Sequence, residues 1–185
     1  MLLPMRRVMI IGQPGSGKST LARQVAEITR LPVIHMDHIH WKPGWVEREA
    51  AEKTRLCEAA AARPAWVFEG GHSRTWPGRL ARADTLVWLD LPVGLRLWRV
   101  TRRTIRYLGR TRPDLPHGCP EQFSAEFYAF IWRTRRSSRE KCAALAASAR
   151  LDQTVQHLRS RREIRAWLDA LRHAADIGSL DLPDR

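Results

Sequence analysis

The segment from Gly12 to Ser19 has the residue types and spacing of a phosphate-binding loop. It matches GxxxxGK[ST] in full, directly after an apolar run and directly before a stretch with helical spacing. Glycines let backbone N–H groups turn toward an anion, and helix N-terminal amides point at the same place. Lys18 then reaches the β- and γ-phosphates, and the Ser19 hydroxyl ligates Mg²⁺. We therefore predict an ATP–Mg²⁺ site formed by Gly12, Pro14, Gly15, Ser16, Gly17, Lys18, Ser19 and Thr20.

Three acidic residues follow apolar runs. Asp37 comes after Pro32–Met36, at the mouth of the expected sheet, where open α/β folds bind ligands. It is a candidate proton acceptor for an attacking hydroxyl, and the alternative is that it caps the segment that follows. Glu69 and Asp90 are rival candidates for the Walker-B acid that holds the Mg²⁺ water shell beside the phosphate loop.

The residues after the second apolar run combine imidazoles and indoles. His35, His38 and His40 lack the i, i+4 spacing of helical zinc ligands, and no thiols lie near them in the sequence. A substrate-facing loop is the better interpretation, in which Trp41 and Trp45 offer flat apolar surface; core packing is the alternative for both rings. Gly70 and Gly71 let a substrate approach the backbone closely, so the predicted substrate-binding residues are Asp37, Trp41, Trp45, Glu69, Gly70 and Gly71.

Arginines gather in the part of the chain after residue 95. Arg99 and Arg103, and likewise Arg102 and Arg106, are i, i+4 pairs that share helix faces. Clustered arginines repel one another unless an anion lies between them, which indicates a phosphate partner. Further arginines of this region are Arg110, Arg112, Arg133, Arg135 and Arg136.

The elements that position these residues alternate between strand and helix. Apolar runs at 7–11, 32–36, 65–68, 85–89 and 154–158 predict strands, and helices are expected at 19–30, 47–63, after Pro92 and from the capping box at Ser160–Glu163 to about His173. Such alternation predicts parallel pairing through right-handed crossovers, and hence a three-layer α/β/α domain. We expect one domain over 1–175, an Arg-rich helical insert at about 95–149, and a C-terminal tail at 176–185.

Composition fits one domain and an anionic ligand. The 185 residues carry a net charge of +13, almost all of it from arginine. This excess fits nucleic-acid backbone, phosphates on small substrates, or solvated side chains alone. Cys57, Cys119 and Cys142 form no CxxC pair, and neither a bilayer-spanning run nor a secretion signal is visible, so we expect reduced thiols and a cytoplasmic location without membrane partners.

These motifs together resemble the adenylate-kinase-like P-loop small-molecule kinases, and most closely the bacterial DNA topology modulation (FlaR-like) proteins. The resemblance rests on the phosphate loop with Ser19–Ala22, the stretch His35–Trp45, Glu69–His72, Ala83-Asp84 with Leu89–Pro92, and Arg112–Asp114 with Gly118–Glu121. It spans the chain to about residue 170 and leaves the substrate open.

The resemblance implies the remaining roles. The five strands take the order 2-3-1-4-5, which places Glu69 beside the phosphate loop and favours it over Asp90 for the Mg²⁺ shell together with Ser19. Asp37 handles the acceptor hydroxyl, and the arginine insert closes over ATP as a lid. The implied catalytic residues are Lys18, Asp37, Arg103 and Arg106, with Arg99 binding nucleotide.

Two functions follow. The first is a kinase that transfers the γ-phosphoryl group of ATP to a small-molecule or nucleotide acceptor. The alternative is a nucleic-acid-associated ATPase or switch protein that affects DNA topology; no helix-turn-helix or paired zinc ligands favour it. A monomer and a homodimer are both compatible with the sequence.

Overall fold

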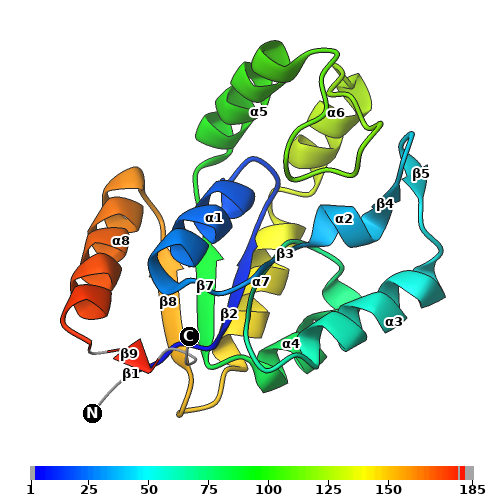
Figure 1. The fold of residues 1–185 in the computed structure, drawn as a ribbon. Helices are drawn as coiled ribbons and strands as arrows, with labels where there is room; N and C mark the ends of the chain where they lie inside the picture. The colour runs from blue at the N-terminus through cyan, green and yellow to red at the C-terminus, as the bar shows by residue number, and fades with distance from the viewer. Residues whose placement is uncertain (1–2, 179, 182–185) are drawn as a thin grey trace.

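A parallel five-stranded sheet forms the centre of the computed structural model, which describes residues 3–178 and 180–181 (Figure 1). Its strands are β2 (Arg7–Gly12), β3 (Val33–His35), β6 (Trp66–Glu69), β7 (Thr85–Leu89) and β8 (Thr154–Leu158). They lie in the order β3-β6-β2-β7-β8, and every pairing is parallel. The predicted α/β class and the predicted strand order 2-3-1-4-5 are both confirmed.

Alternate residues of β2, β6 and β7 enter different hydrophobic clusters, which creates three layers. Met9 and Ile11 of β2 pack with side chains of α3 (Ala50–Ala61), α4 (Trp76–Arg82) and α7 (Ser137–Ala147). Val8 and Ile10 pack on the opposite face against α1 (Lys18–Thr29) and α8 (Arg161–Asp176). Since side chains alternate between the faces of a strand, burial on both faces requires the continuous apolar runs seen in the sequence.

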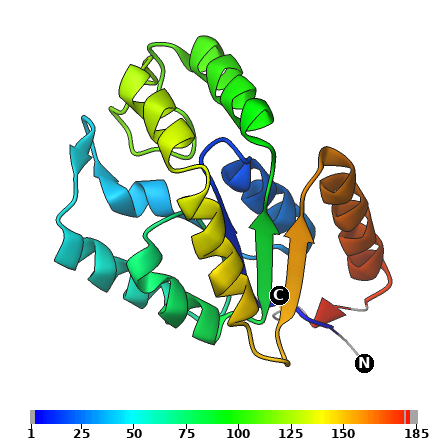
Figure 2. The same cartoon turned by 180° about the vertical axis from the view of Figure 1, so that it is seen from behind.

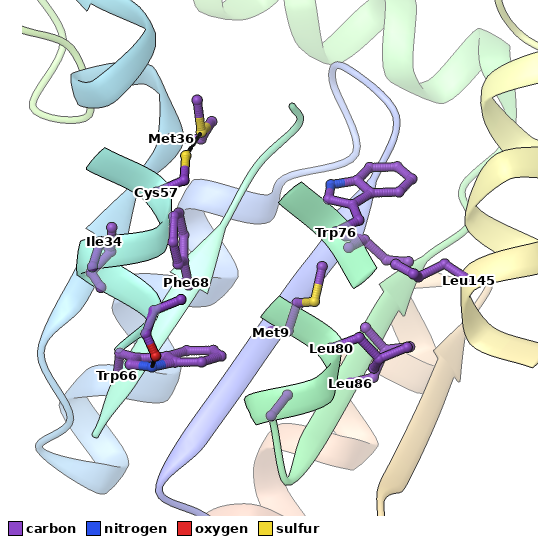
Figure 3. Packing of buried hydrophobic residues seen from close by; sticks show 14 of the residues in the cluster. Met9, Ile34, Met36, Cys57, Trp66, Phe68, Trp76, Leu80, Leu86 and Leu145 are labelled. Carbon is purple, nitrogen blue, oxygen red and sulfur yellow. Dashed lines mark hydrogen bonds between the residues drawn. The ribbon is translucent and has the colours of Figure 1, made fainter. Parts of the chain in front are cut away.

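The first cluster contains the largest fully buried apolar side chains, Trp66 and Phe68 (Figure 3). Trp66 and Phe68 of β6 meet edge to face with ring centroids 6.0 Å apart, and both are fully buried. Burying a side chain such as Phe68 stabilises the fold by about 1.5–3 kcal/mol. At the upper end of the cluster, the Cys57 thiol donates to the Met36 sulfur at 3.4 Å. Met36 directly precedes Asp37, so this packing also positions the site.

Helix α8 begins at the predicted capping box. The Ser160 hydroxyl accepts from the Glu163 amide at 3.1 Å, and the Glu163 carboxylate accepts from the Arg159 amide at 2.8 Å. The helix runs three residues beyond the expected end, to Asp176. In the tail expected at 176–185, β9 (Leu180–Asp181) pairs in parallel with β1 (Leu3–Pro4), and residues 179 and 182–185 lie outside the described residues.

Several short elements were not predicted. Helix α2 (Met36–His40) directly follows β3, and the two-residue strands β4 (Trp41–Lys42) and β5 (Val46–Glu47) form an antiparallel hairpin. A 3-10 turn, η1 (Ser73–Thr75), precedes α4. In Figure 1, α2 and the hairpin project from the same end of the sheet as the phosphate loop.

The expected insert at 95–149 divides into two structural parts. Helices α5 (Val93–Tyr107) and α6 (Ala125–Arg133) lie beyond the end of the sheet, above the phosphate loop (Figure 1). Helix α7, by contrast, contributes Cys142 and Leu145 to a core cluster, so it belongs to a layer of the sheet. The part of the insert that covers the phosphate loop is therefore shorter than expected. Within the described part of the chain, no helix is both long and apolar enough to span a bilayer.

Candidate active site

The phosphate loop connects β2 to α1 with the backbone that its glycines allow. Gly15 has a φ of +78°, and a Cβ atom there would lie 2.6 Å from the carbonyl oxygen of Arg96. Only glycine fits this combination of left-handed backbone and close approach. The loop is thereby held against the first turn of α5.

Two polar side chains of the loop fit a bound triphosphate. The Ser16 hydroxyl oxygen is fully buried and has no hydrogen-bond partner among the described residues. The Lys18 amine lies over the loop, 3.2 Å from the carbonyl oxygen of Gln13. A buried polar atom without a partner is costly, and a phosphate oxygen is the acceptor that this Gly-rich turn is shaped to take. The loop residues therefore fit the phosphates of ATP.

Ser19 and Glu69 meet at the edge of the loop. The Ser19 hydroxyl donates to a Glu69 carboxylate oxygen at 3.0 Å, and the Nδ1 atom of His35 lies 2.8 Å from the same oxygen. Hydroxyl and carboxylate oxygens are suitable ligands for Mg²⁺ and its water shell. Mg²⁺ held here would supply positive charge beside the phosphate oxygens, and the contact with His35 fixes the orientation of Glu69.

Asp90, the rival acid, is engaged on the other side of the loop. Its two oxygens accept from the Arg139 Nε atom at 2.9 and 3.0 Å, and His157 Nε2 lies 3.1 Å from one of them. Burial raises the pKa of Asp90, but the hydrogen bonds from Arg139 and His157 outweigh it and leave the pKa below its ordinary value. No side chain caps α5, so Asp90 does not act as a helix cap before Pro92.

Asp37 is a half-buried carboxylate in the first turn of α2. Burial, together with the negative charge of Glu69, raises its pKa, while Lys18 and Arg112 act in the opposite direction. A raised pKa makes a carboxylate a stronger base. No side chain caps the helix, so the alternative that Asp37 caps the following segment finds no support in its geometry.

Indole rings and backbone carbonyls line the cavity next to Asp37. Trp41 and Trp45 of the β4–β5 hairpin meet edge to face at 5.3 Å. The carbonyl of Gly71 accepts from the Trp76 indole at 3.1 Å and from the Arg79 guanidinium at 2.8 Å. Burial lowers the pKa of Arg79 to about 10, and this arginine makes no ion pair with the described residues. Arg79 therefore acts as an internal clamp that fixes the glycine turn.

The arginines of α5 make different contacts. Arg99 donates to the carbonyl oxygen of Ser16 at 2.7 Å, which links the helix to the phosphate loop. Arg103 is paired with Glu121 at 3.1 Å, so its charge is already balanced by a carboxylate. Arg106 lines the cavity and is exposed, with its guanidinium 5.5 Å from the ring centre of Tyr107. Of the predicted catalytic arginines, Arg106 is thus the more available for a phosphate.

One cavity of about 1270 Å³ brings every predicted site residue together. Its walls also include residues that sequence reasoning left unassigned, above all Trp98 on α5 and Arg161 on α8. The guanidinium carbon of Arg161 lies 5.4 Å from the Trp98 ring centre, and that of Arg102 lies 5.5 Å from it. In the sequence, this group of residues was indicated only by a tryptophan within the arginine-rich helix. The sequence did not show that α8 lies beside α5.

Comparisons with known proteins agree with this geometry. A model of the ATPase family associated with various cellular activities (AAA) matches residues 8–68. A shikimate kinase of Pseudomonas syringae pv. tomato is 32% identical over 123 residues, which cover 58% of this chain and 71% of that protein. A second shikimate kinase, from Pseudomonas savastanoi pv. phaseolicola, is 30% identical over 126 residues, with the same two coverages.

Solved structures share the fold across nearly the whole chain. A shikimate kinase from Bacteroides thetaiotaomicron has a TM-score of 0.56 at 21% identity and covers 95% of this chain and 99% of its own. A gluconokinase from Sinorhizobium meliloti has a TM-score of 0.52 at 17% identity, with coverages of 97% and 99%.

The fold and the phosphate loop define a P-loop kinase, an enzyme that uses ATP with Mg²⁺. Within that class, the chain belongs to the shikimate kinase family.

Proposed function

We propose that the chain transfers the γ-phosphoryl group of ATP to a hydroxyl group of a small, uncharged, ring-containing acceptor. The observation that carries this proposal is Asp37, a carboxylate of raised pKa in the same cavity as Lys18 and Glu69. In this role Asp37 accepts the hydroxyl proton as the acceptor oxygen attacks phosphorus, and the ADP oxygen leaves. Lys18, Arg99 and Arg106 hold the phosphates, and Ser19 with Glu69 holds Mg²⁺.

The charges around Asp37 support an uncharged acceptor. Burial lowers the pKa of both His40 and His72, as does the nearby charge of Lys53, so both imidazoles are neutral at pH 7. Arg112 is held between two carboxylates, 2.7 Å from Asp114 and 2.6 Å from Glu121. Lys18 is assigned to the phosphates of ATP, and Arg23 pairs with Asp114 at 3.7 Å. An anionic acceptor beside Asp37 would therefore meet carboxylates and neutral imidazoles, whereas a sugar or nucleoside ring matches the indoles of the hairpin.

We assign the nucleobase of ATP to the space between α5 and α8. Trp98 is half exposed and lies between the guanidinium groups of Arg102 and Arg161, as described above. Rings stack on indoles and guanidinium planes without strict sequence requirements. With the nucleobase bound in this space, the triphosphate lies in the phosphate loop.

The closer relationship to adenylate kinases and to the FlaR-like proteins is also part of the proposal, since it rests on the sequence motifs above. On that relationship the acceptor would be a nucleoside monophosphate, which the charges around Asp37 disfavour. The nucleic-acid-associated ATPase is not favoured, because the relatives reported above are named as small-molecule kinases.

Measurement of ADP release with an acceptor panel tests the proposal. The panel contains neutral sugars, polyols and nucleosides, and, as charged acceptors, shikimate, gluconate and nucleoside monophosphates. We expect turnover with a neutral member, loss of activity in Lys18→Ala, and a roughly 10²–10⁴-fold lower kcat in Asp37→Asn.

Two outcomes would contradict the proposal in different ways. Turnover with charged acceptors alone would show that the acceptor class is wrong, although the kinase assignment would stand. Full activity of Asp37→Asn with any acceptor would remove the assigned base.

A further inference from the structure

A second cavity, of about 380 Å³, lies behind the phosphate loop. Its lining comes mainly from residues that follow β7 and β8 and from the first turns of α5 and α7. Figure 2 shows how these elements are arranged. Its lining shares only Gln13 with the large cavity described above. The charged residues of this second cavity are Asp90, Arg96, Arg135, Arg136, Arg139 and Arg159.

Five guanidinium groups here share one carboxylate. Asp90 is already bonded to Arg139 through both of its oxygens and to His157. Among the described residues, no carboxylate lies within ion-pair distance of the other four arginines, Arg96, Arg135, Arg136 and Arg159. Like charges in a small cavity repel one another unless an anion lies between them, so the lining is electrostatically complementary to an oxyanion.

Arg96 and Arg135 are held in place by contacts with carbonyl oxygens. Arg96 is 1% exposed and donates to the carbonyl oxygens of Leu91 at 3.1 Å and Pro14 at 3.2 Å. Arg135 donates to the carbonyl oxygen of Trp132 at 2.7 Å, and its guanidinium carbon lies 4.1 Å from the centre of that indole ring. A buried cation that makes no ion pair is costly, and the more distant charge of Asp90 does not outweigh the burial of Arg96. Both side chains are fixed before any ligand binds.

The first turn of α5 adds to the positive character of the cavity. Leu91, Pro92 and Val93 line it, and no side chain caps this 15-residue helix. The amides of a helix N-terminus lack intrahelical partners and carry the positive end of the helix dipole. The N-terminus of α5 and the arginine cluster therefore both favour an anion.

We propose that this cavity is a second anion site, which binds the phosphate group of a small molecule or free inorganic phosphate, separately from ATP. The volume is at the lower end of the range for small-molecule sites, so it suits a compact phosphate compound. The cavity is joined to the phosphate loop by two hydrogen bonds, from Arg96 to Pro14 and from Gln13 to the carbonyl oxygen of Arg135 at 2.7 Å. An anion bound here braces the back of the loop that holds ATP.

Calorimetric titration of the full chain tests this site. The chain is first saturated with Mg²⁺ and a non-hydrolysable ATP analogue, which fill the phosphate loop, and is then titrated with inorganic phosphate or with glycerol 3-phosphate. The test variant is Arg136→Gln/Arg159→Gln, whose side chains are exposed and make no ion pair with the described residues. The matched control is Arg55→Gln/Arg63→Gln, which makes the same change in net charge at exposed positions outside both cavities.

We expect one phosphate group per chain in the wild type and in the control. Affinity in the test variant should be about tenfold weaker for each arginine removed. Binding should persist in Lys18→Ala without nucleotide, because Lys18 belongs to the other cavity. Tighter binding of glycerol 3-phosphate than of inorganic phosphate would identify the ligand as a phosphate ester, and the reverse order as the free ion.

Three results would overturn the proposal. They are the absence of binding to the nucleotide-loaded wild type, equal affinities of the test variant and the wild type, and equal losses in the test and control variants. The last result would mean that net charge alone attracts the anion. Thermal unfolding of each variant establishes that it is folded before it is titrated.

Discussion

A comparison of Gly70→Ala with Gly71→Ala distinguishes a structural role of these glycines from contact with a ligand. Gly70 has a φ of +116°, and a Cβ atom there would lie 2.4 Å from the Cβ of Met36. At Gly71 a Cβ would meet no atom within 4 Å. Gly70→Ala therefore strains the backbone and pushes on Met36, whereas Gly71→Ala places a methyl group in open space.

The expected loss of stability follows from these two contacts. A non-glycine residue in such a backbone conformation costs about 1–3 kcal/mol. An extra methyl group in a packed interior costs about 1–3 kcal/mol more. Gly70→Ala should therefore lower the free energy of unfolding by about 2–6 kcal/mol, a large part of the 5–15 kcal/mol typical of folded proteins. Because Met36 precedes Asp37, we also expect a lower kcat, by up to about 100-fold if Asp37 is displaced by 1 Å.

Urea unfolding and steady-state kinetics of both variants measure these effects. Gly71→Ala should unfold within about 0.5 kcal/mol of the wild type, and any rise in its KM for the acceptor would show that ligand contacts this glycine. Equal stability of the two variants would refute the argument, because it would mean that Met36 and the Gly70 backbone relax without cost.

Three further predictions concern other parts of the site and the fold. Asp37→Asn should be more stable than the wild type at neutral pH, because folding raises the pKa of Asp37 and the ionised carboxylate therefore destabilises the fold above that pKa. The difference in stability should vanish as the pH falls below the ordinary value of 3.8. Urea unfolding at several pH values measures it. Ser160→Ala should lower the free energy of unfolding by about 1 kcal/mol, through loss of the cap on α8, and an unchanged unfolding midpoint would contradict this. Trp98→Ala should weaken nucleotide binding by about 1–3 kcal/mol in a fluorescence titration, whereas Trp132→Ala, equally exposed but outside both cavities, should not.

The sequence was most informative about strands that are buried on both faces. β7 occupies the predicted position to the residue, and β2, β3 and β6 differ by one residue at one or both ends, because a strand covered by helices must be apolar. β8 also lies where it was predicted, although it is an edge strand with exposed residues. The hairpin β4–β5 could not be predicted in this way. Its strands have two residues each, and it depends on contacts such as the hydrogen bond from the Trp45 indole to the carbonyl oxygen of Pro120 at 2.9 Å. Short hairpins are marginal without such tertiary support.

The same distinction applies to the site. The phosphate loop was predictable because its function requires a fixed order of residues along the chain. The partners of the arginines were not, since nothing in the spacing indicates that Arg103 meets Glu121 or that Arg79 clamps the carbonyl of Gly71. Arginines that resemble ligand contacts in the sequence divide, in the structure, into those facing a cavity and those that hold the backbone in place.

The loop between α5 and α6 connects the arginines of α5 to the indoles of the β4–β5 hairpin. At one end, Glu121 accepts from Arg103 and from the Thr104 hydroxyl of α5, at 3.1 and 3.0 Å. At the other end, the Gly118 carbonyl accepts from the amide of Gly44 at 3.1 Å, within the hairpin that carries both tryptophans. A change in the position of α5 is therefore transmitted to the acceptor side through hydrogen bonds that a free lid would lack. By this connection, a shift of α5 on nucleotide binding would also move the hairpin on the proposed acceptor side.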